Sequence, residues 1–348
     1  MLKKLFCVHL LLICAATAAA QTAVNNLVNL PEADTLIYVS PQRILKDAAP
    51  KVMTPADVNK MREQFADIKK AIGIDPTSVD TLVLAVRFHK PSGDLSFVAP
   101  DVMAVLSGDF SSESLLTLAR LYLQDRLRDE KYGTKSISLV KIDPLIAAAE
   151  KNSMLKPYTE LAIAPLSINS LVIGNVSYVK AALDAADGTN RINVASVNSL
   201  LRDPNALISA AGSPLATFAK SFGLNGTETT TRDPRCVTSF GNFYAGVTME
   251  GNNFIVRGAM NADNPDTAKI INSLLSAVME QAVDSVPDKD SQAVLKTLTL
   301  VAKESEVVLQ ASIPEKTVAE FIRKKSESST KPATTQPARK PVRKRRRK

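Results

Sequence analysis

The sequence predicts an α+β protein with two related halves, each an antiparallel sheet with helices packed on one face, followed by a disordered basic C-terminal tail. Three observations support this fold class. Short β-rich stretches alternate apolar and polar residues, as strands with one buried face do. Other stretches repeat apolar residues at helical spacing after N-cap residues. The order strand, polar cap, helix, linker and strand occurs twice, in residues 102–142 and 255–309.

The first half opens with a predicted strand at Thr35–Ser40 and a long amphipathic helix. Thr54 is a suitable N-cap for this helix, Pro55 suits its first position and Gly73 suits its end. One side of the helix carries the apolar residues Val58, Met61, Phe65, Ile68 and Ile72. We expect this side to pack on the core of the protein.

The rest of the first half alternates strands with two shorter helices. The other strands predicted in this half are 81–88, 101–110, 135–142 and a pair within 160–174. A turn at Asn169–Ser170 joins the last pair. A helix capped by Ser111 or Ser112 is predicted over residues 111–127, and a second helix begins at Asn175 and ends at Gly188.

The second half is predicted to contain two hairpins and their helices. A helical piece is expected near residues 198–211. The turns of the two hairpins lie at Glu250–Asn253 and Glu304–Ser305. The pair Asn264–Pro265 is expected to start a helix, and a final helix is predicted over Glu315–Lys324. The predicted parts of the chain are a signal peptide at 1–20, the two halves at 21–190 and 191–325, and the tail at 326–348.

The N-terminus has the pattern of a secretory signal. Two lysines precede an apolar stretch that ends in the small residues Ala18–Ala20. This stretch is short compared with the roughly 20 residues that span a bilayer, which disfavours an uncleaved anchor. A lipid-attachment site at Cys14 is disfavoured because the preceding residue is Ile13. We expect an exported protein, periplasmic or envelope-associated after cleavage near Ala20–Gln21.

Positive charge is concentrated in the tail. The tail has nine Lys and Arg residues and one Glu, which gives +8, and two lysines in the signal give +2. Because the whole chain carries a formal net charge of +8, residues 21–325 carry −2. The folded body is therefore slightly acidic, unlike a basic nucleic-acid-binding module. Together with export, this makes nucleic acid an unexpected physiological partner.

The counts of cysteine and histidine exclude several chemistries. The mature chain would keep Cys236 and His89, since the other cysteines and the other histidine lie in residues 1–20. One cysteine cannot form an intramolecular disulfide, and a body of about 300 residues can bury enough apolar surface without one. One histidine excludes a two-histidine metal site within a single chain. The sequence predicts no metal and no cofactor, with Cys236 buried and His89 in a loop.

Carboxylates are the remaining candidates for catalysis. The candidates are Asp109, Glu113, Asp143, Asp184 and Asp187. Acid-pair hydrolysis needs two carboxylates at a fixed spacing in a cleft, which a sequence does not reveal. An acid near a helix start is more simply explained by its interaction with the helix dipole. An Asp/Glu-based hydrolase, with a cleft between the halves, is therefore an alternative function, and we assign no catalytic residue.

Three stretches of the body carry a resemblance to known proteins. They are "LPEADTLIYVSPQRIL" at 30–45, "AVLSGDFSSESL" at 104–115 and "LVIGNVSYVKAALDAADG" at 171–188. These stretches resemble exported bacterial proteins that are built from repeated α+β units and whose domains have no assigned function. The resemblance covers most of the mature body and rests on strand ends and caps. It implies a bacterial envelope setting and no activity.

The composition of the tail, rich in Ser, Thr, Pro and basic residues, predicts disorder. A solubilising terminus is the plainer interpretation. The functional one is an electrostatic tether to an anionic envelope surface, either lipid headgroups or acidic polymer, at roughly 1 kcal/mol for each basic residue. The residues assigned to this contact are Arg339, Lys340, Arg343, Lys344, Arg345, Arg346, Arg347 and Lys348.

These observations together predict a non-enzymatic binding or scaffold protein of the bacterial envelope. A subunit of a larger envelope complex, with an unknown protein partner, is a further alternative. A large exposed apolar patch on the folded body would favour that alternative.

Overall fold

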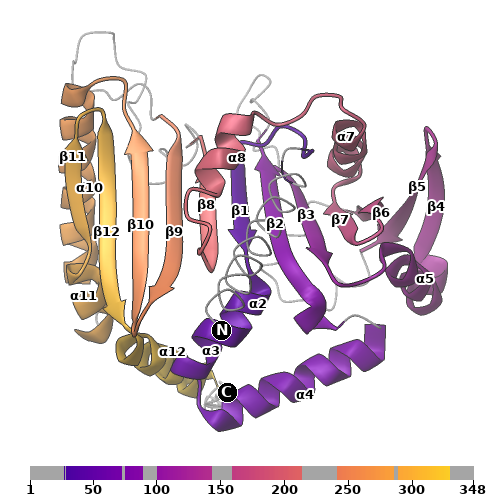
Figure 1. Cartoon of the computed structure of the whole chain (residues 1–348), viewed down its shortest axis with the longest axis horizontal. Helices are drawn as coiled ribbons and strands as arrows, with labels where there is room; N and C mark the ends of the chain where they lie inside the picture. Colours follow the sequence, from indigo (N-terminus) through magenta and orange to yellow (C-terminus); the bar gives the residue numbers. More distant parts are fainter. Residues whose placement is uncertain are drawn as a thin grey trace, which may run out of the picture.

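The computed structural model describes Leu27 and residues 29–72, 75–88, 100–142, 159–213, 241–285 and 289–329. Within these residues the chain forms one antiparallel sheet of 12 strands, in the order β11-β12-β10-β9-β8-β1-β2-β3-β7-β6-β5-β4 (Figure 1). The strands are β1 (Thr35–Val39), β2 (Val79–Arg87), β3 (Asp101–Gly108), β4 (Leu127–Tyr132), β5 (Lys135–Lys141), β6 (Glu160–Ser167), β7 (Ser170–Gly174), β8 (Ile208–Gly212), β9 (Phe243–Glu250), β10 (Asn253–Asn261), β11 (Thr299–Lys303) and β12 (Glu306–Pro314).

Helices connect these strands and cover parts of both faces of the sheet. The α-helices are α2 (Pro41–Arg43), α3 (Ala49–Val52), α4 (Pro55–Ile72), α5 (Ser112–Leu123), α7 (Val176–Ala186), α8 (Val194–Leu200), α10 (Pro265–Ser285), α11 (Lys289–Lys296) and α12 (Glu315–Ser329). A π-helical turn at Ile44–Ala48 joins α2 to α3, and 3-10 turns occur at Pro76–Ser78 and Gln124–Arg126.

The sheet continues through its centre, where β1 pairs with β8. Thr35 lies opposite Gly212 and Ile37 lies opposite Ala210 in this antiparallel pair. The α+β class and the antiparallel pairing are confirmed, but the described residues form one sheet and not one sheet for each half. The strand order outward from the centre is matched, β1-β2-β3 on one side and β8-β9-β10 on the other. The boundary near residue 190 stays a prediction.

One strand lies where the sequence predicts helix, and one predicted helix ends early. The expected helix near 198–211 is replaced by α8, which ends at Leu200, and by β8. The sequence of β8, "ISAAG", contains alanine, which favours helices, but hydrogen bonds to β1 and β9 on its two sides outweigh that preference. The helix predicted over 111–127 ends at Leu123, because Gln124 has a φ of 40° and leads into β4. The charged sequence of β4 suits an exposed edge strand.

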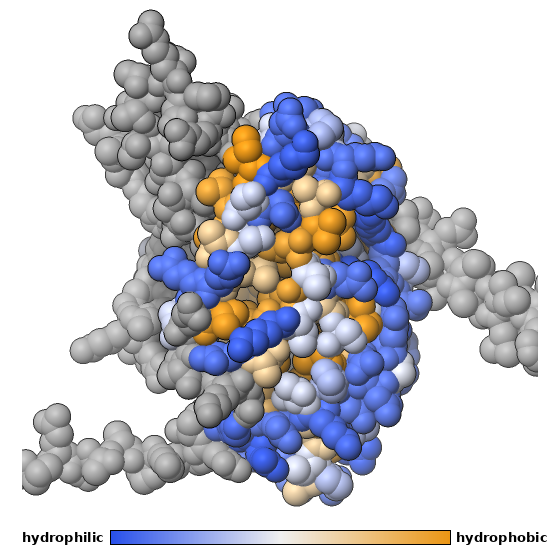
Figure 2. Space-filling view, turned by 90° about the vertical axis from the view of Figure 1, so that its left-hand side faces the viewer, coloured by the Kyte–Doolittle hydropathy of each residue, from blue (hydrophilic) through white to orange (hydrophobic). Residues whose placement is uncertain are grey.

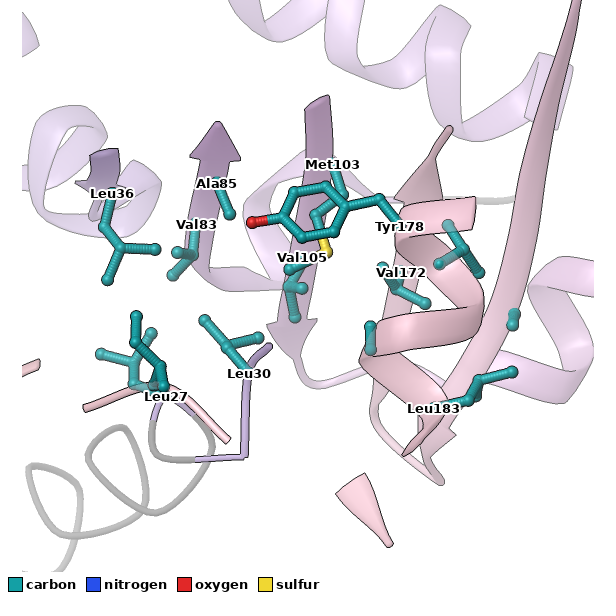
Figure 3. Close-up of a cluster of buried hydrophobic side chains, with 14 of the residues drawn as sticks. Leu27, Leu30, Leu36, Val83, Ala85, Met103, Val105, Val172, Tyr178 and Leu183 are labelled. Atoms are coloured by element: carbon teal, nitrogen blue, oxygen red, sulfur yellow. The ribbon is translucent and has the colours of Figure 1, made fainter. Parts of the chain in front are cut away.

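The largest core lies on the face of the sheet beneath α7 and α8. Val83 and Met103 from the strands pack around Tyr178 of α7, whose side chain is fully buried (Figure 3). The Tyr178 hydroxyl donates a hydrogen bond to the carbonyl oxygen of Glu32 at 2.9 Å. The guanidinium of Arg87 lies 4.5 Å from the centre of the same ring. Tyr178 therefore joins α7, the sheet and the N-terminal segment.

A second core lies on the opposite face, beneath α10. The strand pairings place five residues in one row across the sheet: Thr35, Gly212, Phe243, Met260 and Val307. Directly paired residues share a face, and Met260 and Val307 pack against Ile271 of α10. Leu36 follows Thr35 and belongs to the core beneath α7, because successive side chains of a strand alternate between faces. The helices thus cover opposite faces at the two ends of the sheet.

Several local predictions are confirmed by hydrogen bonds and backbone angles. The N–H of Asp57 donates to Thr54 Oγ1 at 3.2 Å, and the N–H of Thr267 donates to Asn264 Oδ1 at 2.9 Å. Both hairpins of the second half form at the predicted turns, and Gly251 has a φ of 60°. The last helix, α12, continues to Ser329, so it includes the first residues of the predicted tail.

Candidate functional site

Helix α4 lies along one rim of the molecule, past the ends of the strands (Figure 1). Its main packing partners are α3, α5 and the turn at Pro76–Ser78. Val58, Met61 and Phe65 are half-buried, and Ile68 is 39% exposed. The expectation that this stripe packs on the core is therefore wrong in part. Because α4 lies past the ends of the strands, it packs mainly on α3, α5 and the turn at Pro76–Ser78 (Figure 1).

Other exposed apolar side chains occur on the helices beside α4. Leu121 and Tyr122 at the end of α5 are 65% and 55% exposed, and the Tyr122 hydroxyl donates to the Lys70 carbonyl of α4 at 3.4 Å. Phe321 and Ile322 of α12 are 43% and 38% exposed.

We call this surface the apolar rim. It consists of Val58, Met61, Phe65 and Ile68 of α4, Leu121 and Tyr122 of α5, and Phe321 and Ile322 of α12. Five of the ten large apolar side chains that are exposed in the described part of the chain belong to it. Such gathering marks an interaction surface more often than scattered exposure does.

A groove of about 740 Å³ separates α4 from α12. Its walls combine apolar side chains, Met61 and Ile322 among them, with charged residues of both signs, such as Arg323 and the acids Asp57 and Glu320. The N-terminal end of α12 meets α3, where Lys51 Nζ lies 4.0 Å from the Glu315 carboxylate. The same ammonium donates to the carbonyl of Gly251, in the turn between β9 and β10. The groove thus lies between the middle of α12 and the N-terminal half of α4.

The charge of the rim itself is small, and the charge of the segment that follows it is large. Helices α4 and α12 each contain four basic and three acidic residues, which gives each a net charge of +1. Residues 330–348 contain nine basic residues and no acidic one. Ser329 is seven residues beyond Ile322, or roughly 10 Å along a helix. The basic segment therefore begins close to the apolar rim.

Two of the candidate carboxylates hold α7 against the β4–β5 hairpin. Asp184 accepts a hydrogen bond from the Tyr132 hydroxyl at 2.8 Å, and Asp187 forms an ion pair with Lys135 at 2.7 Å. Each carboxylate has a structural partner. These contacts explain both residues without a catalytic role.

Two other candidates lie at the junction of β3 and α5. Glu113 is in the first turn of α5, where an acid interacts favourably with the helix dipole. Asp109 lies near Asp80, and the pKa of Asp80 is raised, chiefly by burial and further by the charge of Asp109. This neighbour of Asp109 is separated from it by a long stretch of sequence, so no sequence signal indicated it.

Several predicted residues lie outside the described residues. They are residues 1–20, His89, Asp143, Cys236 and the tail from residue 330. Their predicted roles, including the tail contact with an anionic surface, stay predictions. Within the described ranges, no group of three or more His, Cys, Asp or Glu side chains could hold a metal ion. The helices of those ranges are each too short or too polar to cross a membrane.

The fold and the rim together define an α+β protein with an amphipathic helical end. No known family model and no curated protein sequence matches the chain. Among solved structures it is similar to TP0453 of Treponema pallidum, crystal form III, with a TM-score of 0.43 and 11% identity over 86% of this chain and 97% of that chain. Crystal form I of the same protein gives a TM-score of 0.41 and 13% identity over 86% and 96%. We transfer no residue role and no function from this likeness.

Proposed function

We propose that this chain is an exported, non-enzymatic binding or scaffold protein of the bacterial envelope, which attaches to an anionic lipid surface through the apolar rim and the basic tail. The observation that supports this proposal best is the gathering of exposed apolar side chains on α4, α5 and α12, at the point from which the basic segment continues. An amphipathic helix that lies in a membrane interface buries its apolar face just below the headgroups.

The two parts of this surface act in different ways. Each basic residue of the tail contributes roughly 1 kcal/mol near an anionic leaflet, less the effects of chain flexibility and salt. Full burial of a large apolar side chain is worth roughly 1.5–3 kcal/mol, so a side chain as exposed as Ile68 or Leu121 gains about 1 kcal/mol on insertion. Neither part is strong alone, and stable peripheral attachment generally takes two such signals. Salt weakens the electrostatic attraction of the tail to the lipid and leaves the apolar contribution of the rim unchanged.

Vesicle sedimentation tests both parts. The mature chain, Gln21–Lys348, is expected to sediment with phosphatidylglycerol vesicles more than with phosphatidylcholine vesicles. A chain ending at Ser329 should lose the salt-sensitive part of this binding. The double variant Ile68→Ser/Leu121→Ser should lose the part that persists at high salt. Val301→Ser, which removes an exposed apolar side chain from β11, is the matched control.

The outcomes of that experiment distinguish the rim from the tail. If both the truncated chain and the rim variant bind as the mature chain does, the proposal is wrong. If the mature chain binds native bacterial envelopes but no lipid vesicle, a protein partner is favoured. The exposed apolar side chains of the rim and the groove between α4 and α12 also fit this second candidate, a subunit of a larger envelope complex, because a groove with apolar and charged walls can accept an amphipathic partner helix.

A further inference from the structure

An apolar cavity of about 600 Å³ lies on the face of the sheet beneath α10, away from the rim. Figure 2 views the molecule from the α10–β11 end, where apolar residues appear between polar ones. The cavity is lined by Leu275 of α10, Leu300 of β11 and Leu309 of β12 at one end. At the other end it is lined by Val86 of β2 and by Phe88, which directly follows this strand.

The strand register explains why this part of the sheet is hollow. Phe243, Met260 and Val307 form one row, and the side chains of Met260 and Val307 pack beneath α10. The next row on the same face contains Ala245 opposite Gly258. One methyl group on β9 and one hydrogen on β10 leave the row low at these two strands, whereas Leu309 of β12, opposite Gly258, ends the low part. A trough therefore remains between the low part of the row and α10.

The shape and the polarity of the cavity indicate one chemical class of ligand. Its lining residues run from β11 through β12, β10 and β9 to β1 and β2, crossing six intervals between neighbouring strands. At about 4.8 Å for each interval, the strands that line the trough span roughly 29 Å. A volume of about 600 Å³ over that length leaves a narrow cross-section. A compact ring system would not fill such a trough, whereas an extended hydrocarbon chain would.

The polar side chains of the wall are few. Among the lining residues, hydroxyl side chains belong to Thr35 and Ser213, since the Tyr244 ring lies on the other face of the sheet, beside Arg202. No cationic side chain lines the cavity within the described part of the chain. A ligand here is held by apolar contact and not by charge. We infer that this cavity binds the acyl chain of a fatty acid or of a single-chain lipid, which is a binding site separate from the rim and the tail.

Fluorescence of cis-parinaric acid, a fatty acid that emits when its chain enters an apolar site, tests this inference on the mature chain. Saturable binding is expected, with an affinity that changes little with salt. Ala245→Phe places a ring in the trough and should weaken binding about tenfold or more. Ser312→Phe adds the same ring to the opposite face of β12 and should leave binding unchanged. If palmitate displaces the probe and lysophosphatidylglycerol does not, the ligand is a free fatty acid. If both displace it, the site accepts the acyl chain of a fatty acid and of a single-chain lipid.

Gly258→Ala provides a milder second variant in case Ala245→Phe fails to fold. A methyl at Gly258 would lie 3.3 Å from the Tyr244 carbonyl oxygen and 3.6 Å from Leu309 Cβ, so it fits with a small shift and narrows the trough. Weaker binding by this variant supports the site. The inference is overturned if the mature chain does not bind the probe, or if folded Ala245→Phe and Gly258→Ala proteins bind it as the mature chain does. Rim variants should keep probe binding, so this result is independent of vesicle attachment.

Discussion

The hydroxyl of Tyr178 offers a sharp test of how the core is held together. This side chain is fully buried between α7 and the strands, and its hydroxyl donates to the Glu32 carbonyl at 2.9 Å. Tyr178→Phe removes that hydroxyl and keeps the ring. The carbonyl of Glu32 then loses its buried partner, while the contact of the ring with Arg87 remains.

The expected loss follows from the net value of one partly buried hydrogen bond, because the Tyr178 side chain is buried whereas Glu32 is exposed. The net contribution of a neutral hydrogen bond is about 0.5–1.5 kcal/mol. We therefore expect Tyr178→Phe to lower the free energy of unfolding by about 1 kcal/mol. Tyr178→Ala also removes the ring and should cost about 3–5 kcal/mol, if the variant folds.

Urea unfolding of the mature chain, followed by circular dichroism, measures this difference. Tyr122→Phe is the matched control, because the Tyr122 side chain is exposed and its hydroxyl contact with the Lys70 carbonyl is long, at 3.4 Å. The control should change the free energy of unfolding by less than about 0.5 kcal/mol. If Tyr178→Phe changes it as little as Tyr122→Phe does, the proposed role of the Tyr178 hydroxyl is wrong.

Three further predictions concern local structure. Hydrogen bonds from Thr77 and from the ammonium of Lys69 lower the pKa of Asp75 to about 2, below its ordinary value of 3.8. The ionised carboxylate therefore stabilises the fold above about pH 4. This contribution is lost as the pH falls towards 2. Between pH 4 and pH 2 the free energy of unfolding should fall less for Asp75→Asn than for the wild type. If urea unfolding shows the same fall for both proteins, the prediction is contradicted. Asn264→Ala should lower the free energy of unfolding by about 1 kcal/mol, because it removes the N-cap of α10. An unchanged midpoint of urea unfolding would contradict this prediction. Gly251→Ala should cost about 1 kcal/mol because φ is 60° there, and an unchanged thermal midpoint would refute that reasoning.

Much of the local structure could be predicted from the sequence because its signals are local. The caps at Thr54 and Asn264 each satisfy an N–H group three residues away. The turn before Asn253 fixes the register of its hairpin, and that register places Ala245 opposite Gly258. The central pairing of β1 with β8 joins segments far apart in the sequence, and the alanines of β8 suggest a helix. That strand could not be recognised without its two neighbours.

The sequence indicates which residues are basic and which helices are amphipathic, but not which of these helices form the rim. The charge of the tail is plain in the sequence, whereas the stripe on α4 has the same periodicity whether it faces a core, a partner or a membrane. Leu121 lies within a predicted helix, and nothing near it in the sequence indicates that it meets the rim. The trough likewise depends on how α10 lies over the row of Ala245, which a sequence pattern does not specify.

Insertion of the rim into lipid tests the central claim most directly. The chain contains no tryptophan, so Leu121→Trp gives a single fluorophore on the rim, and Val301→Trp gives one on β11 as a control. With phosphatidylglycerol vesicles, the fluorophore at position 121 is expected to shift its emission to the blue and to be quenched by brominated lipid, while the one at position 301 stays unchanged. If the protein binds these vesicles and the emission from position 121 stays that of a water-exposed side chain, the rim does not enter the membrane and the account is contradicted.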